Sequence, residues 1–180
     1  DDDRPLTVTG DTYNEGSPRA LFTVDANPGQ LLTFDVQDLA EPGGVATGPD
    51  GEPSDLDGDD TGDALNNTPI YYSVDGGATW SLYDPLVPVT AGDVPVLVAV
   101  DITPETDGVY EGPQQFALVV NDGLPTAKTG YSTIVDDGTG KKTNPIDEST
   151  TDDPGTDPGG VLDDDRPLTV TGDTYNEGSP

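Results

Sequence analysis

The chain has 180 residues and a formal charge of −30 at pH 7, from 36 acidic and 6 basic residues with no histidine. This charge disfavours nucleic acid and anionic membranes as partners. Without His or Cys the chain has no Ser-His or Cys-His catalytic pair, no disulfide and no thiolate metal site. No apolar run approaches the ~20 residues of a membrane-spanning helix. The apolar residues, 31% of the chain, gather in short β-branched and aromatic runs, which favours a folded core over a disordered acidic chain.

Short strands separated by turns are predicted along most of the chain. Helical periodicity is missing, 23 Gly and 18 Pro interrupt the sequence every few residues, and most apolar runs place alternate residues on one face. The predicted strands are, in chain order, Leu6–Thr9, Ala20–Val24, Leu31–Val36, Ile70–Val74, Thr79–Tyr83, Val96–Ile102, Phe116–Val120 and Gly130–Val135. About seven or eight such strands indicate an all-β fold, an antiparallel β-sandwich of two sheets.

Three segments contrast with these strands. Residues 41–63 form an insertion of Gly, Asp and Pro with almost no apolar side chain, and residues 141–162 have the Gly, Pro, Thr and acidic composition of a linker. Asp163–Pro180 then repeats Asp1–Pro18 without a single change. Such a self-match indicates a tandem array. We therefore predict one domain over residues 1–140, an inter-repeat linker over 141–162 and the beginning of the next repeat over 163–180.

The sharpest short motif is SVDGGATW, from Ser73 to Trp80. It matches the Asp-box pattern, a β-hairpin whose Asp caps the turn while the Trp packs beneath it. Sialidase-type propellers carry several such boxes, but a propeller needs repeated four-stranded blades and this chain has one copy. The Asp-Gly-Gly turn explains the motif as a turn and core anchor rather than as a catalytic element.

Acidic residues gather where predicted strands meet loops. They are Glu15, Asp101, Asp107, Glu111, Asp136 and Asp137. A sandwich could bring them together at one end, where several carboxylates would need a counter-charge, and Ca²⁺ takes about six to eight oxygen ligands. The alternative is a set of solvated turn residues, because Asp-Gly is also favourable turn chemistry.

The insertion contains a second group of acids, Asp55, Asp57, Asp59 and Asp63. Its D-x-D-x-D opening is typical of a calcium loop. However, the sixth position is Asp60 where an EF-hand needs Gly, and the twelfth is Asn66 where it needs a bidentate Glu. No helices are predicted on either side. We therefore reject an EF-hand and retain a looser Ca²⁺ site as a hypothesis.

Four ordered motifs carry a family resemblance. They are NEGSP from Asn14, YSVDGGATW from Tyr72, YEGPQQF from Tyr110 and TIVDDGTG from Thr133. Over about residues 1–140, the sequence resembles the extender repeats of giant RTX adhesins, which Gram-negative bacteria secrete by the type I route, and more distantly Calx-β modules. The sequence departs from the family at two positions, since Thr106 and Gln114 stand where the family often has acidic residues.

The resemblance implies an Ig-like sandwich that binds Ca²⁺ near its ends and at the joints between repeats. By resemblance, the ligand candidates are Glu15, Asp107, Glu111, Asp136 and Asp137. At the joint, we expect the acids that begin the next repeat to share Ca²⁺ with those that end this one and so to stiffen the array. These joint acids are Asp163, Asp164 and Asp165.

The function expected from the resemblance is that of a non-enzymatic, calcium-stabilised spacer at a bacterial cell surface. It would hold a ligand-binding tip away from the cell and contact neighbouring identical repeats, without a small-molecule substrate. The alternative is an adhesive module that binds a glycan or another surface through Ca²⁺, which would need an exposed aromatic or amide-rich cleft beside the ion. A glycosidase would need two acids facing each other across a cleft.

Overall fold

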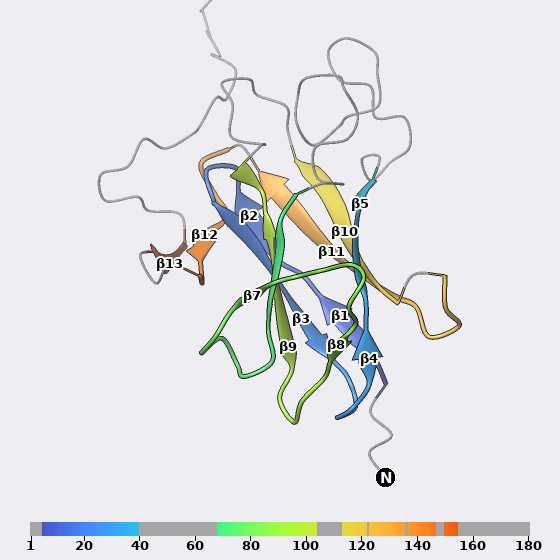
Figure 1. Cartoon of the computed structure of the whole chain (residues 1–180). Helices are drawn as coiled ribbons and strands as arrows, with labels where there is room; N and C mark the ends of the chain where they lie inside the picture. Colours follow the sequence, from blue (N-terminus) through green and yellow to red (C-terminus); the bar gives the residue numbers. More distant parts are fainter. Residues whose placement is uncertain are drawn as a thin grey trace, which may run out of the picture.

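The alternating apolar runs form one continuous, curled sheet whose two halves, the first and the second sheet, pack face to face. The computed structural model describes residues 5–39, 68–103, 113–121, 123–135, 137–146 and 150–154 (Figure 1). The first sheet contains, in spatial order, β1 (Thr7–Thr9), β3 (Arg19–Asp25), β9 (Val96–Asp101), β6 (Ile70–Ser73) and β7 (Ser81–Leu82). The second contains β5 (Phe34–Leu39), β10 (Gln114–Val120), β11 (Lys128–Val135), β2 (Thr12–Asn14), β12 (Lys141–Asn144) and β13 (Thr150–Pro154). A separate pair consists of β4 (Leu31–Leu32) and β8 (Val89–Thr90).

The N-terminal strand is shared between the two sheets and changes from one to the other at Gly10. β1 runs antiparallel to β3, with Val8 opposite Val24, whereas β2 runs parallel to β11, with Tyr13 opposite Ile134. A first strand divided in this way, with four-stranded sheets of order β1-β3-β9-β6 and β2-β11-β10-β5, is the arrangement of an Ig-like sandwich. The predicted fold class is therefore confirmed.

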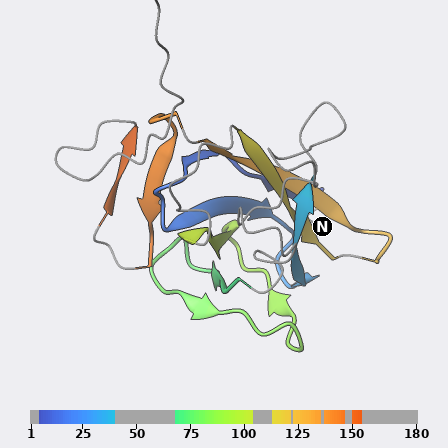
Figure 2. The same cartoon turned by 90° about the horizontal axis from the view of Figure 1, so that it is seen from above.

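The core lies between the facing sides of the two sheets. β3 alternates half-buried and buried residues, so that Ala20, Phe22 and Val24 point inward, as the two-residue period of a strand requires. Phe22 meets Phe116 of β10 across the core, with ring centroids 5.6 Å apart and an edge-on orientation. Figure 2 shows the layers from above, with the yellow and orange strands β10 and β11 opposite the green strands of the first sheet.

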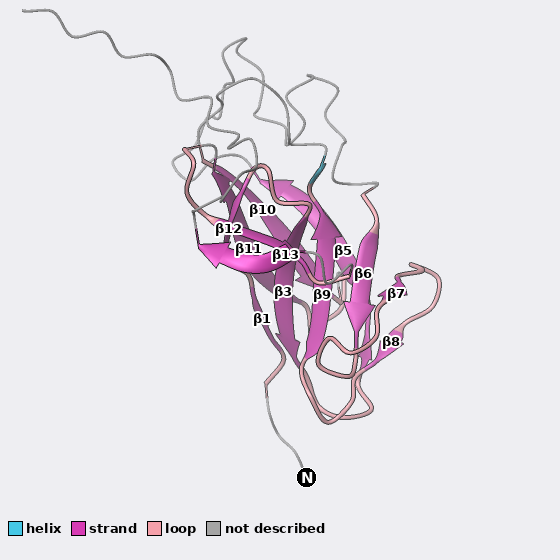
Figure 3. Ribbon diagram, turned by 90° about the vertical axis from the view of Figure 1, so that its left-hand side faces the viewer, coloured by secondary structure: helices cyan, strands magenta, loops and turns pink. Residues whose placement is uncertain are grey.

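β12 joins the two sheets along one side. Lys141 lies opposite Tyr13 of β2, and Thr143 lies opposite Arg19 of β3. β13 pairs antiparallel with β12. Figure 3 shows that β6 and β7 lie at the other edge of the sandwich from β12. β12 and β13 fall within residues 141–162, where the sequence predicts a linker, and the pairing of β12 makes its residues part of the sandwich.

Each predicted strand overlaps an observed one, with one division. The predicted strand Leu31–Val36 is split at Thr33 into β4 and β5, which pair with β8 and β10 respectively. Asn121 fixes this division, because its side-chain oxygen accepts from the Thr33 N–H (3.0 Å) and its own N–H donates to the Thr33 carbonyl (2.9 Å). The short strands β2, β8, β12 and β13 are additions that the sequence did not predict.

Candidate functional site at the upper end of the sandwich

Antiparallel strands bring several strand ends together at the upper end of the sandwich in Figure 1. We define this upper end by the last residues of β2, β9 and β11 and the first residues of β3 and β10. The strands that flank residues 40–67 and 104–112 also end or begin there. Three predicted calcium ligands lie in the described part of this end: Glu15, Asp101 and Asp137.

The opening motif of the domain contacts its closing motif at this end. The Glu15 N–H donates to the Val135 carbonyl (3.0 Å), and the Asn14 side-chain amide donates to the Thr139 carbonyl (2.8 Å). Glu15 is 5% exposed. Gly140 follows with a positive φ of 85°, and a Cβ atom there would lie 2.6 Å from the Asn14 nitrogen. Two motifs far apart in the sequence therefore form one packed junction.

Asp137 closes the turn after β11. Its side-chain oxygen accepts from the Thr139 N–H (2.9 Å) and from the Thr139 hydroxyl. The side chain is exposed. These contacts are those of an Asp-capped turn. The hydrogen bonds of Asp137 therefore match those of a solvated turn residue, which is the alternative to a calcium ligand.

Asp101 forms an ion pair with Arg19 at the end of β9. The Arg19 Nη1 lies 2.8 Å from the Asp101 carboxylate, and the two side chains are only 15% and 16% exposed. The Arg19 guanidinium also stacks 5.5 Å from the centre of the Tyr71 ring. The Thr103 N–H and hydroxyl donate to the same carboxylate, at 3.0 and 2.6 Å. Arg19 thus provides a positive counter-charge for Asp101. The role of Asp101 as a calcium ligand stays a prediction.

Ser17 links the upper end to β12. Its hydroxyl donates to the Arg19 carbonyl (2.8 Å) and accepts from the Thr143 N–H (2.9 Å), and its side chain is fully buried. The sequence analysis assigned no role to Arg19 or Ser17. Arg19 could have been found as one of the few bases of the chain, placed directly after the NEGSP motif.

Within the described residues, no three Asp or Glu side chains lie close enough together to hold a metal ion. The described acids Glu15, Asp101 and Asp137 therefore do not form such a group by themselves. The other predicted ligands lie outside the described residues: Asp107, Glu111, Asp136, Asp55, Asp57, Asp59, Asp63, Asp163, Asp164 and Asp165. Their grouping stays a prediction.

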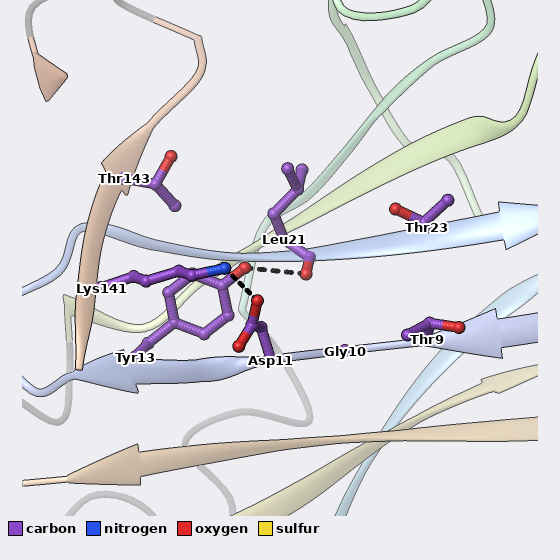
Figure 4. Close-up of a pocket in the computed structure, with 8 residues that line it drawn as sticks. All are labelled: Thr9, Gly10, Asp11, Tyr13, Leu21, Thr23, Lys141 and Thr143. Atoms are coloured by element: carbon purple, nitrogen blue, oxygen red, sulfur yellow. Dashed lines mark hydrogen bonds and ion pairs between the residues drawn. The ribbon is translucent and has the colours of Figure 1, made fainter. Parts of the chain in front are cut away.

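A cavity of about 250 Å³ opens where the N-terminal strand changes sheets (Figure 4). The Tyr13 hydroxyl crosses it to donate to the Leu21 carbonyl (2.9 Å), and Asp11 forms an ion pair with Lys141 at its rim. Partial burial works to raise the Asp11 pKa, but the Lys141 hydrogen bond and charge, with the Thr12 N–H, lower it further than burial raises it. The lining therefore combines hydroxyl groups, apolar groups and one exposed ion pair.

The Asp-box hairpin joins β6 to β7 at the end of the sandwich that lies near the N-terminus in Figure 1, which is the lower end. The Asp75 carboxylate accepts from the Thr79 N–H (2.9 Å), the Thr79 hydroxyl (2.6 Å) and the Ser73 hydroxyl (2.7 Å). These bonds, led by the Thr79 hydroxyl, lower the Asp75 pKa from 3.8 to about 2. The Trp80 indole donates to the Gly77 carbonyl (3.1 Å). The predicted role of the motif as a turn anchor is confirmed, whereas its predicted role as a core anchor is not, because Trp80 is half-buried and lies outside the core cluster.

Comparison with known proteins adds little about function. No family model and no curated protein matches the sequence. The structure is similar to the crystal structure of the periplasmic chaperone SfaE, with a TM-score of 0.36 and 11% identity. The match covers 72% of this chain and 56% of the chaperone chain. A likeness this weak supports no inference about function. Among the described residues, no helix is long and apolar enough to cross a membrane.

Proposed function

We propose that this chain is a structural repeat of a bacterial cell-surface adhesin. It acts as a non-enzymatic, calcium-stabilised spacer outside the cell, joined to neighbouring identical repeats, and it holds a ligand-binding tip away from the surface. The observation that carries the proposal is the unchanged recurrence of Asp1–Pro18 at Asp163–Pro180. Units that recur in tandem contact mainly their neighbours, so that adding units lengthens the molecule.

The path of the chain supports a spacer. Because β2 and β11 run parallel, the N-terminal strand enters at the lower end of the sandwich and β11 finishes at the upper end (Figure 1). β11 has eight residues, which span about 26 Å at ~3.3 Å per residue. The N-terminal strand and β11 therefore carry the chain from the lower to the upper end, and β13, the last described strand, turns back antiparallel to β12.

The charge balance supports a stabilising cation. The 6 basic residues cannot neutralise 36 acids, and Arg19 already pairs with Asp101. Glu15 is largely buried, and its N–H donates to the carbonyl of Val135. Val135 directly precedes the predicted ligands Asp136 and Asp137 in the sequence. A net charge of this size opposes compaction of the chain unless cations neutralise it. Ca²⁺, which prefers carboxylate oxygens, would supply positive charge at the junction between two repeats.

Calcium binding is tested by thermal melts of the chain in millimolar Ca²⁺ and in chelator at matched ionic strength. A ligand specific for the folded state adds about 4 kcal/mol at a thousandfold excess over Kd, which corresponds to a rise in Tm of roughly 10 °C for a chain of this size. Glu15→Gln should reduce this rise, whereas Asp93→Asn, an equal charge change at an exposed lower-end residue, should not. Equal melting temperatures in both buffers would exclude a calcium-stabilised repeat.

The spacer role is tested separately by small-angle scattering on two or more repeats in tandem. Ca²⁺ at the joint should give a narrow distribution of inter-domain distances, and chelator should give a broad one. Replacing Asp136 and Asp137 with Asn should make the calcium curve approach the chelator curve. Equal flexibility in both conditions would show that Ca²⁺ does not stiffen the joint, and would limit its role to the fold of each repeat.

A further inference from the structure

We infer that the slot filled by the N-terminal strand segment, Pro5–Asn14, can also accept the copy of that segment, Pro167–Asn176. The slot lies between β3 and β11 and is therefore an interaction surface whose partner is a second copy of one ten-residue sequence. The inference rests on the packing of the described segment and on the sequence identity, and it requires neither calcium nor the proposed function.

The N-terminal strand segment completes both sheets of the sandwich. It adds β1 to the edge of the first sheet beside β3, and it adds β2 to the second sheet between β11 and β12. Leu6 and Tyr13 are buried in the common core, at 8% and 3% exposure. The Tyr13 hydroxyl also donates to the Leu21 carbonyl of β3. A sandwich that lost this segment would expose core residues on both β3 and β11.

Two glycines give the slot its selectivity. A Cβ atom at Gly10 would lie 2.3 Å from the Tyr131 carbonyl oxygen and 2.4 Å from the Ser132 hydroxyl, so the crossing segment needs Gly at this point. A Cβ atom at Gly130 of β11 would lie 2.5 Å from a methyl group of Val8. The slot therefore accepts a segment with glycine between its two strands, and the sequence that meets this requirement occurs again with Gly172 in the place of Gly10.

Because the two segments are identical, the tether decides which one occupies the slot. The N-terminal strand segment is joined to β3 through the short turn Glu15–Pro18, which gives it a high effective concentration. The copy is joined through residues 155–166, and twelve residues can span about 40 Å, which exceeds the ~26 Å length of β11. The copy can therefore reach the slot within its own chain when the first segment is disabled.

The first test uses the redundancy of the two segments in the full 180-residue chain. Gly10→Val disables the N-terminal strand segment, and Gly172→Val disables the copy. We expect Gly172→Val to melt like the unaltered chain, and Gly10→Val to keep a cooperative transition. The double variant should melt at least about 8 °C below Gly10→Val, because neither segment then fits without a severe contact. Gly130→Val blocks the slot itself and should destabilise the chain whichever segment is intact.

Equal melting of Gly10→Val and the double variant would overturn the inference, because the copy would then provide no replacement. A Gly10→Val chain that does not fold at all would overturn it for the same reason. Unchanged melting of the double variant would also contradict it, since the slot would not require glycine at the crossing.

The second test traps the copy in the slot by a disulfide. Thr9 lies opposite Thr23 in the antiparallel pair of β1 and β3. The Cα atoms of such partners are about 4.5–5.5 Å apart, which is a distance that a disulfide can bridge. The chain has no cysteine of its own that could compete. In the Gly10→Val background, Thr23→Cys with Thr171→Cys should form a disulfide within one chain. Thr9→Cys with Thr23→Cys in the unaltered background is the positive control, and Thr23→Cys with Thr156→Cys controls for reach alone.

Absence of the disulfide in the Thr23→Cys, Thr171→Cys variant, or an equal yield in the Thr156→Cys control, would contradict entry of the copy in register. Disulfide-linked dimers in place of monomers would show that the copy comes from a second molecule and would overturn the same-chain assignment.

Discussion

The Asp-box turn at the lower end and the junction of the opening and closing motifs at the upper end satisfy their polar groups in different ways. At the lower end, the Asp75 carboxylate finds its partners, Ser73 and Thr79, within four residues of sequence. At the upper end, the partners are distant: Asn14 bonds to Thr139, which lies 125 residues further along the chain. The lower turn can form as soon as its hairpin forms, whereas the upper junction requires the assembled sandwich. Substitutions in this upper junction should therefore reduce global stability more than equivalent ones in the Asp-box turn.

The largest expected effect is that of Arg19→Ala. This change leaves Asp101 without its guanidinium partner in a site where both side chains are about five-sixths buried, and it removes the stacking on Tyr71. Breaking one partner of a buried pair costs about 3–5 kcal/mol. Because this pair keeps some contact with solvent, we expect a loss near the lower value, about 3 kcal/mol, in the free energy of unfolding measured with urea.

A double-variant cycle isolates the pair from the other contacts of Arg19. Asp101→Asn keeps the shape of the side chain and removes its charge, and Arg19→Ala with Asp101→Asn removes both charges. The double variant should be more stable than the sum of the two single losses predicts, by about 1–2 kcal/mol. Strict additivity would show that the two side chains do not stabilise each other.

The contrast between the ends also explains what the sequence could predict. β3 and β10 were predicted because burial imposes a period of two on Phe22, Val24, Phe116 and their neighbours. The Asp-box turn was predicted because all of its hydrogen-bond partners lie within one motif. By contrast, the KKTN sequence of β12 has no apolar alternation, and its place in the sandwich depends on the distant strands β2 and β3.

The same limit applies to the candidate site. The sequence placed Glu15 and Asp101 at strand ends, and the structure brings both to the upper end. It could not show that Arg19 lies opposite Asp101, because this contact depends on the antiparallel register of β3 and β9. Strand-end position can be predicted from hydrophobic pattern, but the pairing of two charges from different strands requires the register.

A smaller difference is expected between two buried serines with similar roles at the two ends. The Ser17 hydroxyl accepts from the buried Thr143 N–H of β12, and the Ser73 hydroxyl accepts from the half-buried Gly77 N–H (2.8 Å). An N–H that loses its partner costs about 1–3 kcal/mol when water cannot replace it. We expect Ser17→Ala to lower the free energy of unfolding by about 2 kcal/mol and Ser73→Ala by about 1 kcal/mol, measured by urea unfolding.

Hydrogen exchange separates these two serine variants further. Ser17→Ala should accelerate exchange at Thr143 and in β12, far from the substitution in sequence, while Ser73→Ala should affect mainly the hairpin between β6 and β7. If Ser73→Ala were the more destabilising, or if Ser17→Ala left β12 protected, the distinction between the two ends would be wrong.

The smallest expected effect is the acid response of the lower turn. The Thr79 hydroxyl and N–H and the Ser73 hydroxyl lower the Asp75 pKa from 3.8 to about 2. A folded-state pKa below the unfolded value means that this contribution is complete above about pH 4 and is lost as the pH falls from about 4 to 2. The side-chain carboxyl signal of Asp75 in NMR should titrate near pH 2 and move back towards 3.8 in Thr79→Ala. The fluorescence of Trp80, whose indole donates to the Gly77 carbonyl in the same turn, provides a second signal. Its change between about pH 4 and 2 should be smaller in Asp75→Asn, because that variant has no Asp75 carboxylate to protonate. A carboxyl titration near the ordinary value in the unaltered chain would show that the turn does not hold its carboxylate, and the local order attributed to the lower end would then be wrong.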